Sequence, residues 1–81
     1  MRLDKYLKVS RLIKRRTVAN EAAGQGKVLL NGKEAKPSAT VQVGDIIEMR
    51  FGERVMRVEV LSVAEHAAKA DAAELYRVLE A

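Results

Sequence analysis

The residues of this sequence most able to do chemistry are lysines and arginines, and they gather in its first half. Residues 1–36 carry ten basic and three acidic side chains, a net charge of +7, whereas residues 37–81 carry five basic and eight acidic side chains, a net charge of −3. A surface with such an excess of positive charge attracts polyanions. Nucleic acid is the commonest partner of this kind, and an acidic protein or a membrane surface comes second.

Two neighbouring arginines single out one segment for phosphate binding. Arg15 and Arg16 stand where a second helix is expected to begin, and the dipole of a helix disfavours cations at that end. A helix N-terminus beside two arginine side chains is, however, well suited to hold phosphate. We therefore predict that the Arg11–Arg16 segment binds phosphate groups. The candidate RNA-binding residues of the chain are Arg2, Lys5, Lys8, Arg11, Lys14, Arg15, Arg16, Lys27 and Lys33. For the lysines that flank the predicted hairpin, Lys27, Lys33 and Lys36, a role as solvated strand edges fits equally well.

No pattern in the sequence is typical of an enzyme or of a metal site. The chain has no cysteine, and its single histidine, His66, stands in the alanine-rich segment HAAKAD. The acidic residues are scattered singly, and there is no glycine-rich loop of the kind that holds nucleotide phosphates. We therefore expect no catalytic residue, no metal ion and no cofactor.

The hydropathy pattern gives no sign of a membrane or a secreted protein. No stretch approaches the ~20 apolar residues that a membrane span needs, and the N-terminal residues MRLDKYLKVSRLIKRR lack the apolar region of a secretory signal. Together with the absence of cysteine, these features predict a cytoplasmic protein with no membrane partner.

Two short helices should position the basic residues. Over residues 2–10, apolar side chains recur on one side of a helical wheel and basic side chains on the other, which predicts an amphipathic helix. The pattern fails after Ser10, so residues 11–16 are expected to form a turn. A second helix is predicted over residues 17–25, with Thr17 as its N-cap and with Val18 and three alanines on its packed side.

After Gly26 the hydrophobic period changes to that of strands. The dipeptide Asn31-Gly32 is typical of a two-residue hairpin turn whose central residues both have positive φ. The predicted strands are 27–30, 33–36, 46–51 and 55–63. The fold class is therefore α+β, with two N-terminal helices packed on a small antiparallel sheet in residues 1–63. Residues 64–81 are expected to form a linker and a C-terminal helix that begins at Asp71 and packs Leu75 and Leu79 on the sheet.

The aromatic residues bear on the mode of RNA binding. Tyr6 and Phe51 fall on apolar faces of their predicted elements and Tyr76 lies beside one, so all three are expected in the core. A protein that binds single strands needs exposed aromatic side chains on which bases stack. We therefore expect recognition of the backbone and shape of a structured RNA.

The order of these features resembles the S4-type RNA-binding domain. The resemblance rests on Arg2-Leu3-Asp4-Lys5-Tyr6-Leu7, Arg16-Thr17 with Ala19, Gly26 with Val28, Asn31-Gly32 and Gly44-Asp45, and it covers residues 2–49. The position before the arginine, often a serine in that family, is Arg15 here. The resemblance implies the S4-like (αL) RNA-binding fold and a non-catalytic function.

A longer match narrows the resemblance. RLDKYLKVSRLIKRRT and MRFG, followed by a strand and a predicted helix, look like the small bacterial S4 proteins of ribosome-associated quality control, the RqcP type, which are related to heat shock protein 15. This resemblance implies binding to a large ribosomal subunit obstructed by peptidyl-tRNA, with contacts to large-subunit rRNA and to the tRNA. It also implies a monomer that assists a partner protein, which recruits alanyl-tRNA and adds a C-terminal alanine tail to the stalled chain.

Two other functions fit the same residues. One is an S4-domain factor for the assembly or recycling of ribosomal subunits, as the relation to heat shock protein 15 suggests. The other, from a different class, is a basic adaptor that binds an acidic protein or an anionic membrane. An assembly factor would prefer immature rRNA, and nuclease treatment would not release an adaptor.

Overall fold

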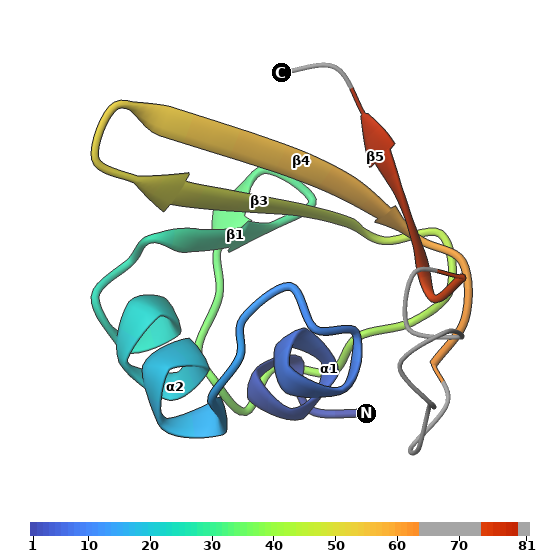
Figure 1. Ribbon diagram of the computed structural model, residues 1–81, viewed down its shortest axis with the longest axis horizontal. Coiled ribbons are helices and arrows are strands. Elements are labelled where there is room, and N and C mark those ends of the chain that lie inside the picture. The colour runs from blue at the N-terminus through green and yellow to red at the C-terminus, as the bar shows by residue number, and fades with distance from the viewer. Residues whose placement is uncertain (64–73, 80–81) are drawn as a thin grey trace.

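The computed structural model describes residues 1–63 and 74–79, and it places two helices against one face of an antiparallel sheet (Figure 1). The sheet has the strand order β2-β1-β3-β4-β5. The helices and strands are α1 (Leu3–Val9), α2 (Arg16–Gly24), β1 (Val28–Leu30), β2 (Lys33–Glu34), β3 (Ile46–Phe51), β4 (Arg54–Val60) and β5 (Tyr76–Leu79). The predicted α+β class is therefore confirmed.

The first helix forms where the sequence predicts it and supplies much of the core. Leu3, Tyr6 and Leu7 recur at the spacing of one helix face, and all three are completely buried. The helix ends at Val9, with Ser10 as its C-cap, because Arg11 adopts a left-handed backbone with a φ of 61°. That conformation suits the residue after a helix C-cap, so the chain turns away where the hydrophobic pattern fails.

The second helix begins one residue earlier than predicted and differs at two positions. Its N-cap is Arg15, with an extended backbone and no side-chain capping bond, so the prediction of Thr17 as N-cap is wrong. Val18, predicted on the packed side, is 44% exposed, because Ala19, Ala22 and Ala23 form the buried face instead. Small side chains on that face let α2 lie close to α1.

Turn residues set the register of the sheet as predicted. Asn31 and Gly32 both have positive φ values, 53° and 84°, so the β1–β2 hairpin has the predicted turn. The side chain of Asn31 also accepts a hydrogen bond from the backbone N–H of Ile46 at 2.9 Å and donates one to Asp45 at 3.1 Å. These bonds fasten the hairpin to the start of β3.

The two faces of the sheet have different characters. On the helix side, Ile47, Met49 and Val58 are buried against α1 and α2. On the opposite side, the carboxylate of Glu48 accepts hydrogen bonds of 2.8 Å from both Arg50 and Arg57. Glu59 and Arg77 form a further pair on that side. These two acidic and three basic side chains carry a net charge of only +1, so the outer face is close to electrically neutral.

The C-terminal segment departs from the prediction. Residues 76–79 form strand β5, which pairs with β4 through Val58↔Val78 and Val60↔Tyr76, so a helix over these residues is wrong. The segment Tyr-Arg-Val-Leu combines aromatic and β-branched residues, which suit a strand once an unpaired edge of the sheet lies beside them. The predicted start of that helix, Asp71, and the predicted linker lie outside the described residues.

Candidate nucleic-acid interface

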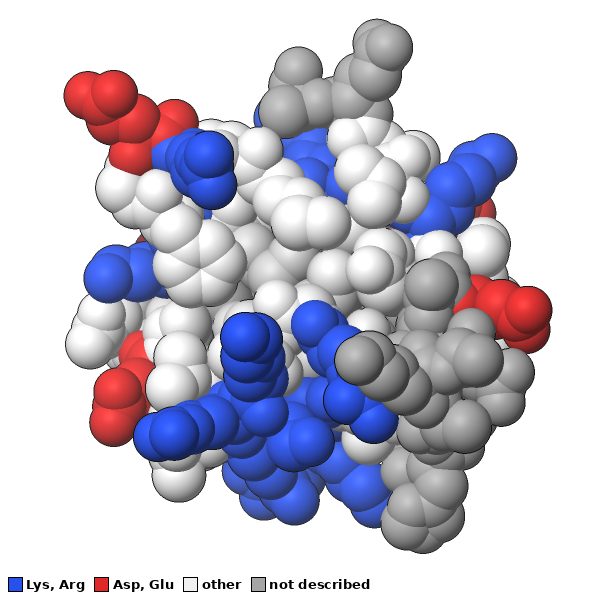
Figure 2. Space-filling view, in the orientation of Figure 1, with Lys and Arg blue, Asp and Glu red and all other residues white. Residues whose placement is uncertain are grey.

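Basic side chains gather over the helical layer. Figure 2 shows a cluster of lysine and arginine side chains over the lower part of the molecule, where Figure 1 places α1, α2 and the segment between them. Of the predicted RNA-binding residues in this layer, all but one are exposed, and Lys5 is half-buried. They are Arg2, Lys5, Lys8, Arg11, Lys14, Arg15 and Arg16.

The other two predicted residues lie elsewhere. Lys27 is exposed on the connection between α2 and β1, and Lys33 is exposed on β2, the strand at one edge of the sheet. The fold therefore brings seven of the nine predicted residues into the helical layer and leaves two lysines on or beside the sheet.

One carboxylate organises the arginines at the start of the two helices. Asp4, in the first turn of α1, is 2% exposed. Its side chain accepts two hydrogen bonds of 3.2 Å from the guanidinium of Arg2, and one of 3.5 Å from Arg16. It also accepts bonds from the Asn20 side chain at 3.3 Å and from the backbone N–H of Lys5 at 2.8 Å. A single carboxylate thus joins α1 and α2 through charged and polar partners.

The environment of Asp4 keeps its carboxyl group ionised. Burial by itself raises the pKa of Asp4, but hydrogen bonds from Arg2, Asn20 and the backbone of Lys5, together with the charge of Arg16, outweigh burial and lower the pKa below the usual value of 3.8. At neutral pH the cluster of Arg2, Asp4 and Arg16 therefore carries a net charge of +1.

Both arginines of the cluster retain donors for a ligand. The side chains of Arg2 and Arg16 are 51% and 48% exposed. A guanidinium group has five N–H donors, of which Arg2 uses two on Asp4 and Arg16 uses one. A pocket of about 380 Å³ opens beside them, lined by Asp4, Arg16, Thr17, Asn20 and Glu21. Exposed arginine donors beside a pocket with further polar groups are suited to bind phosphate oxygens.

The backbone around α1 fixes where Arg2 stands. Arg2 forms an isolated bridge with Thr40, and the N–H groups of Leu3 and Asp4 donate to the carbonyl oxygens of Ala39 and Pro37 at 2.8 and 3.1 Å. These bonds satisfy two amides that the first turn of a helix leaves without partners. Arg2 is therefore held from both sides, by the chain before β3 and by Asp4.

Sequence reasoning missed the role of Asp4 and so misjudged Arg16. The helix dipole argument treats Arg16 as an unfavourable charge at the start of α2, whereas the structure gives it an acidic partner on α1. The sequence did contain a signal for this role. Asp4 is an acidic residue whose neighbours on the predicted helix, Leu3 and Leu7, point into the core. A carboxylate at such a position requires donors nearby.

The aromatic residues follow the prediction in part. Tyr6 is buried, and its hydroxyl donates to the Leu75 carbonyl at 2.6 Å. Burial, together with the charge of Tyr76, raises the pKa of Tyr6 to about 12. Phe51, expected in the core, is 43% exposed, so that prediction is wrong. Phe51 is the last residue of β3, next to the turn at Gly52, and a pocket separates it from residues of α2.

Metal ligands and membrane spans are the remaining features of the described residues. Among the described residues, no three histidine, cysteine or acidic side chains come together as metal ligands. No helix within residues 1–63 and 74–79 is long and apolar enough to cross a membrane.

Comparison with known proteins shows to which protein family the chain belongs. The sequence model of the S4 domain matches residues 1–47. The chain is 50% identical over 80 residues to the RQC P-site tRNA stabilizing factor of Listeria innocua, which covers 99% of this chain and 87% of that protein. The corresponding factor of Bacillus subtilis is 49% identical and covers 99% and 93% of the two chains.

A solved structure extends the comparison to the fold. Heat shock protein 15 of Vibrio cholerae, described as trimeric, superposes with a TM-score of 0.89 at 34% identity, over 98% of this chain and 81% of that one. The chain belongs to the S4 domain family and, within it, to the family of the RQC P-site tRNA stabilizing factors. Both resemblances predicted from the sequence are thus confirmed.

Proposed function

We propose that this protein binds a large ribosomal subunit obstructed by peptidyl-tRNA, contacts both the rRNA and the tRNA, and holds the tRNA in place. Its action supports a partner protein that adds a C-terminal alanine tail to the stalled chain. The observation that carries the proposal is the cluster of Arg2, Asp4 and Arg16, in which one buried carboxylate orients two exposed guanidinium groups beside a pocket. The close relatives named as P-site tRNA stabilizing factors support the same function.

The mechanism is positioning rather than chemistry. The seven basic residues of the helical layer supply contacts to phosphate groups, and the fixed geometry of Arg2 and Arg16 restricts how a backbone can lie on them. Because the two helices are joined through Asp4, a tRNA or rRNA segment bound there meets one rigid surface. The protein acts in the cytoplasm on the ribosome, as a monomer and without a cofactor.

The decisive experiment measures co-sedimentation of the protein with large subunits that carry peptidyl-tRNA and with empty large subunits. Arg16→Ala should weaken co-sedimentation with subunits that carry peptidyl-tRNA by about 10- to 100-fold, the scale of a charge-assisted hydrogen bond to phosphate. Arg16→Lys should recover part of the loss, because lysine cannot make a bidentate contact. Arg77→Ala, which removes an exposed arginine from the outer face of the sheet, is the matched control and should bind like wild type. Equal binding of wild type to empty subunits would contradict the proposal.

The likeness to heat shock protein 15 favours a second candidate, a factor for subunit assembly or recycling. A heat shock protein 15 homologue of Aeromonas salmonicida is 38% identical over 93% of this chain, although the match covers only 57% of that protein. Co-sedimentation with subunits that contain immature rRNA separates the two functions. Preference for those particles over subunits that carry peptidyl-tRNA would support assembly and contradict tRNA stabilisation.

A further inference from the structure

A second pocket lies further along α2 from the cluster of Arg2, Asp4 and Arg16. It has a volume of about 280 Å³ and is lined by Val18, Glu21, Ala22, Gln25, Lys27 and Phe51. Three of these residues, Val18, Glu21 and Ala22, lie on α2, and Gln25 is its C-cap; the four are spaced along one side of the helix. The opposite wall is Phe51 at the end of β3, which a hydrogen bond of 2.8 Å from the Arg50 N–H to the Lys27 carbonyl holds beside the entry to β1.

The lining of this pocket suits a flat ring. Phe51 and Val18 are 43% and 44% exposed, so the fold leaves an aromatic and an aliphatic side chain open to solvent on either side of the pocket. The Gln25 amide can donate and accept hydrogen bonds, Glu21 can accept them, and Lys27 adds a positive charge. An aromatic wall with hydrogen-bonding groups at its margin is how proteins hold an unstacked base.

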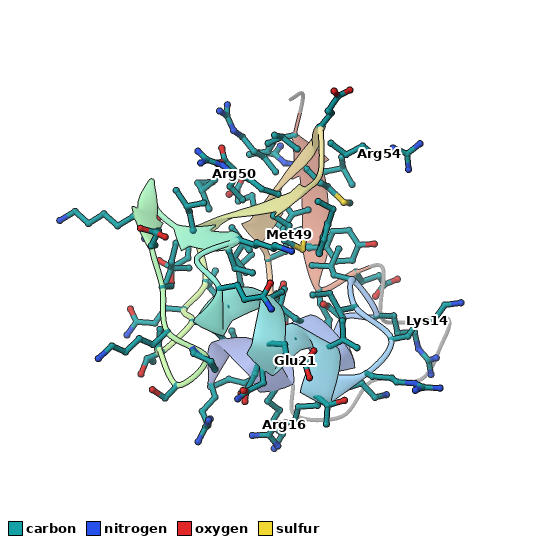
Figure 3. The ribbon with its side chains drawn as sticks, turned by 90° about the vertical axis from the view of Figure 1, so that its left-hand side faces the viewer. Lys14, Arg16, Glu21, Met49, Arg50 and Arg54 are labelled. Carbon is teal, nitrogen blue, oxygen red and sulfur yellow. The ribbon has the colours of Figure 1, made fainter. Side chains whose placement is uncertain are left out.

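The pocket adjoins the arginine cluster. Glu21 lines both this pocket and the pocket beside Arg16. Thr17, in the first pocket, and Gln25, in the second, are eight positions apart in the sequence, a distance of about 12 Å along a helix. Figure 3 looks onto this side of the molecule, with Glu21 near the centre, Arg16 below it and Arg50 above. One short RNA segment can therefore reach both pockets.

We propose that this second pocket receives an unstacked nucleobase of the bound RNA, stacked on Phe51, while Lys27 contacts a neighbouring phosphate. The inference rests on the proposed function, since it assigns a second contact to the same RNA. It explains why Phe51 is exposed although its sequence pattern places it in a core. It also gives Lys27, which lies outside the helical layer, a role in binding.

Two substitutions of Phe51 separate base stacking from apolar contact. In co-sedimentation with large subunits that carry peptidyl-tRNA, Phe51→Ala should weaken binding by about 5- to 100-fold, the range found for loss of one stacked base. Phe51→Leu keeps an apolar side chain but loses the aromatic ring, and it should weaken binding nearly as much. Val43→Ala is the matched control, because Val43 is 63% exposed and precedes the opposite end of β3. Thermal unfolding checks that each variant is folded.

A spectroscopic variant reports on the contact itself. The chain has no tryptophan, so Phe51→Trp places its one tryptophan at the pocket. On binding the same subunits, its fluorescence should be quenched by stacking on a base. An increase with a blue shift, or full binding by Phe51→Leu, would overturn the inference and assign the pocket to an apolar protein contact. No change in fluorescence would also overturn it. If wild type fails to bind these subunits at all, the proposed function fails instead.

Discussion

Asp4 lies in the first turn of α1 with its carboxylate shared between the guanidinium groups of Arg2 and Arg16. In a protein that binds a polyanion, the negative charge of an acidic residue beside the ligand repels it and weakens binding. Its presence is explained if the orientation of the arginines matters more than the total charge. This explanation can be tested, because the effects of charge and of orientation on RNA affinity have opposite signs.

Asp4→Asn should weaken RNA binding although it raises the net positive charge. The substitution keeps the size of the side chain but removes the charged acceptor for both arginines, and the free energy of unfolding should fall by about 1–3 kcal/mol. Urea unfolding measures the stability, and co-sedimentation with peptidyl-tRNA-bearing subunits measures the affinity. Glu53→Gln removes one negative charge from an exposed turn and is the control. Tighter binding by a folded Asp4→Asn would show that the total charge, and not the orientation of the arginines, determines the RNA affinity.

The lowered pKa of Asp4 gives a dependence on pH. The folded protein holds a proton on Asp4 less readily than the unfolded chain, whose pKa is near 3.8. The stability that this carboxylate contributes is therefore present above about pH 4 and is lost as pH falls through the pKa of the folded state. The difference in the free energy of unfolding between wild type and Asp4→Asn should be largest at pH 7 and shrink toward pH 2.5. A constant difference across this range would contradict the assignment.

At the scale of elements, the turn between α1 and α2 combines a basic surface with a strained backbone. Arg11 has a φ of 61°, a region that costs a residue with a side chain about 1 kcal/mol more than glycine. Arg11→Gly should therefore raise the free energy of unfolding or leave it unchanged, while it lowers the affinity for RNA. Arg11→Ala removes the same charge without relieving the backbone and serves as the comparison. Loss of stability in Arg11→Gly would show that the arginine side chain supports the turn.

A single hydrogen bond ties α1 to the segment before β5. The hydroxyl of Tyr6 donates to the carbonyl of Leu75, 69 residues away. Tyr6→Phe should lower the free energy of unfolding by about 0.5–1.5 kcal/mol. The loss is modest because the same carbonyl also accepts the N–H of Leu61 at 2.8 Å. Chemical denaturation measures the change, and RNA binding should be unaffected. A loss of binding at unchanged stability would place this segment in the interface.

Local patterns in the sequence predicted the elements whose stability is local. The apolar spacing of α1 and the Asn31-Gly32 turn each depend on neighbouring residues, and both appear as expected. Strand β5 could not be predicted in this way, because its residues take strand geometry only beside β4. The acidic Glu74 and the following leucines also fit a helix, and only the unpaired edge of the sheet decides between the two.

The candidate site was predictable in composition but not in geometry. Seven of the basic residues share one layer because they lie on α1, α2 and the turn between them, a grouping that the amphipathic pattern already indicated. The link from Asp4 to Arg16 could not be read from the sequence, since it depends on how α1 packs against α2. The exposure of Phe51 was missed for a similar reason. Its alternation marks a core face, but a pocket separates it from the facing side of α2, so its side chain stays 43% exposed.

At the scale of the whole molecule, charge is divided between two sides. The helical layer carries exposed lysines and arginines (Figure 2), whereas Glu48 and Glu59 on the outer face of the sheet are paired with arginines. A polyanion therefore meets an attractive surface on one side of the protein and a nearly neutral one on the other. This asymmetry orients the protein before close contacts form.

The salt dependence of binding tests this division directly. If six or seven phosphates are contacted through the helical layer, the logarithm of the binding constant should fall with the logarithm of the salt concentration, with a slope of about −4 to −6. Arg15→Ala should make the slope shallower by about one, because it removes one phosphate contact. Arg57→Ala, on the outer face of the sheet, should leave the slope unchanged. Titration of labelled protein with large subunits that carry peptidyl-tRNA, at several potassium chloride concentrations and constant magnesium, measures these slopes. Equal slopes for wild type and Arg15→Ala, or a slope near zero for wild type, would show that the basic layer is not where the RNA lies.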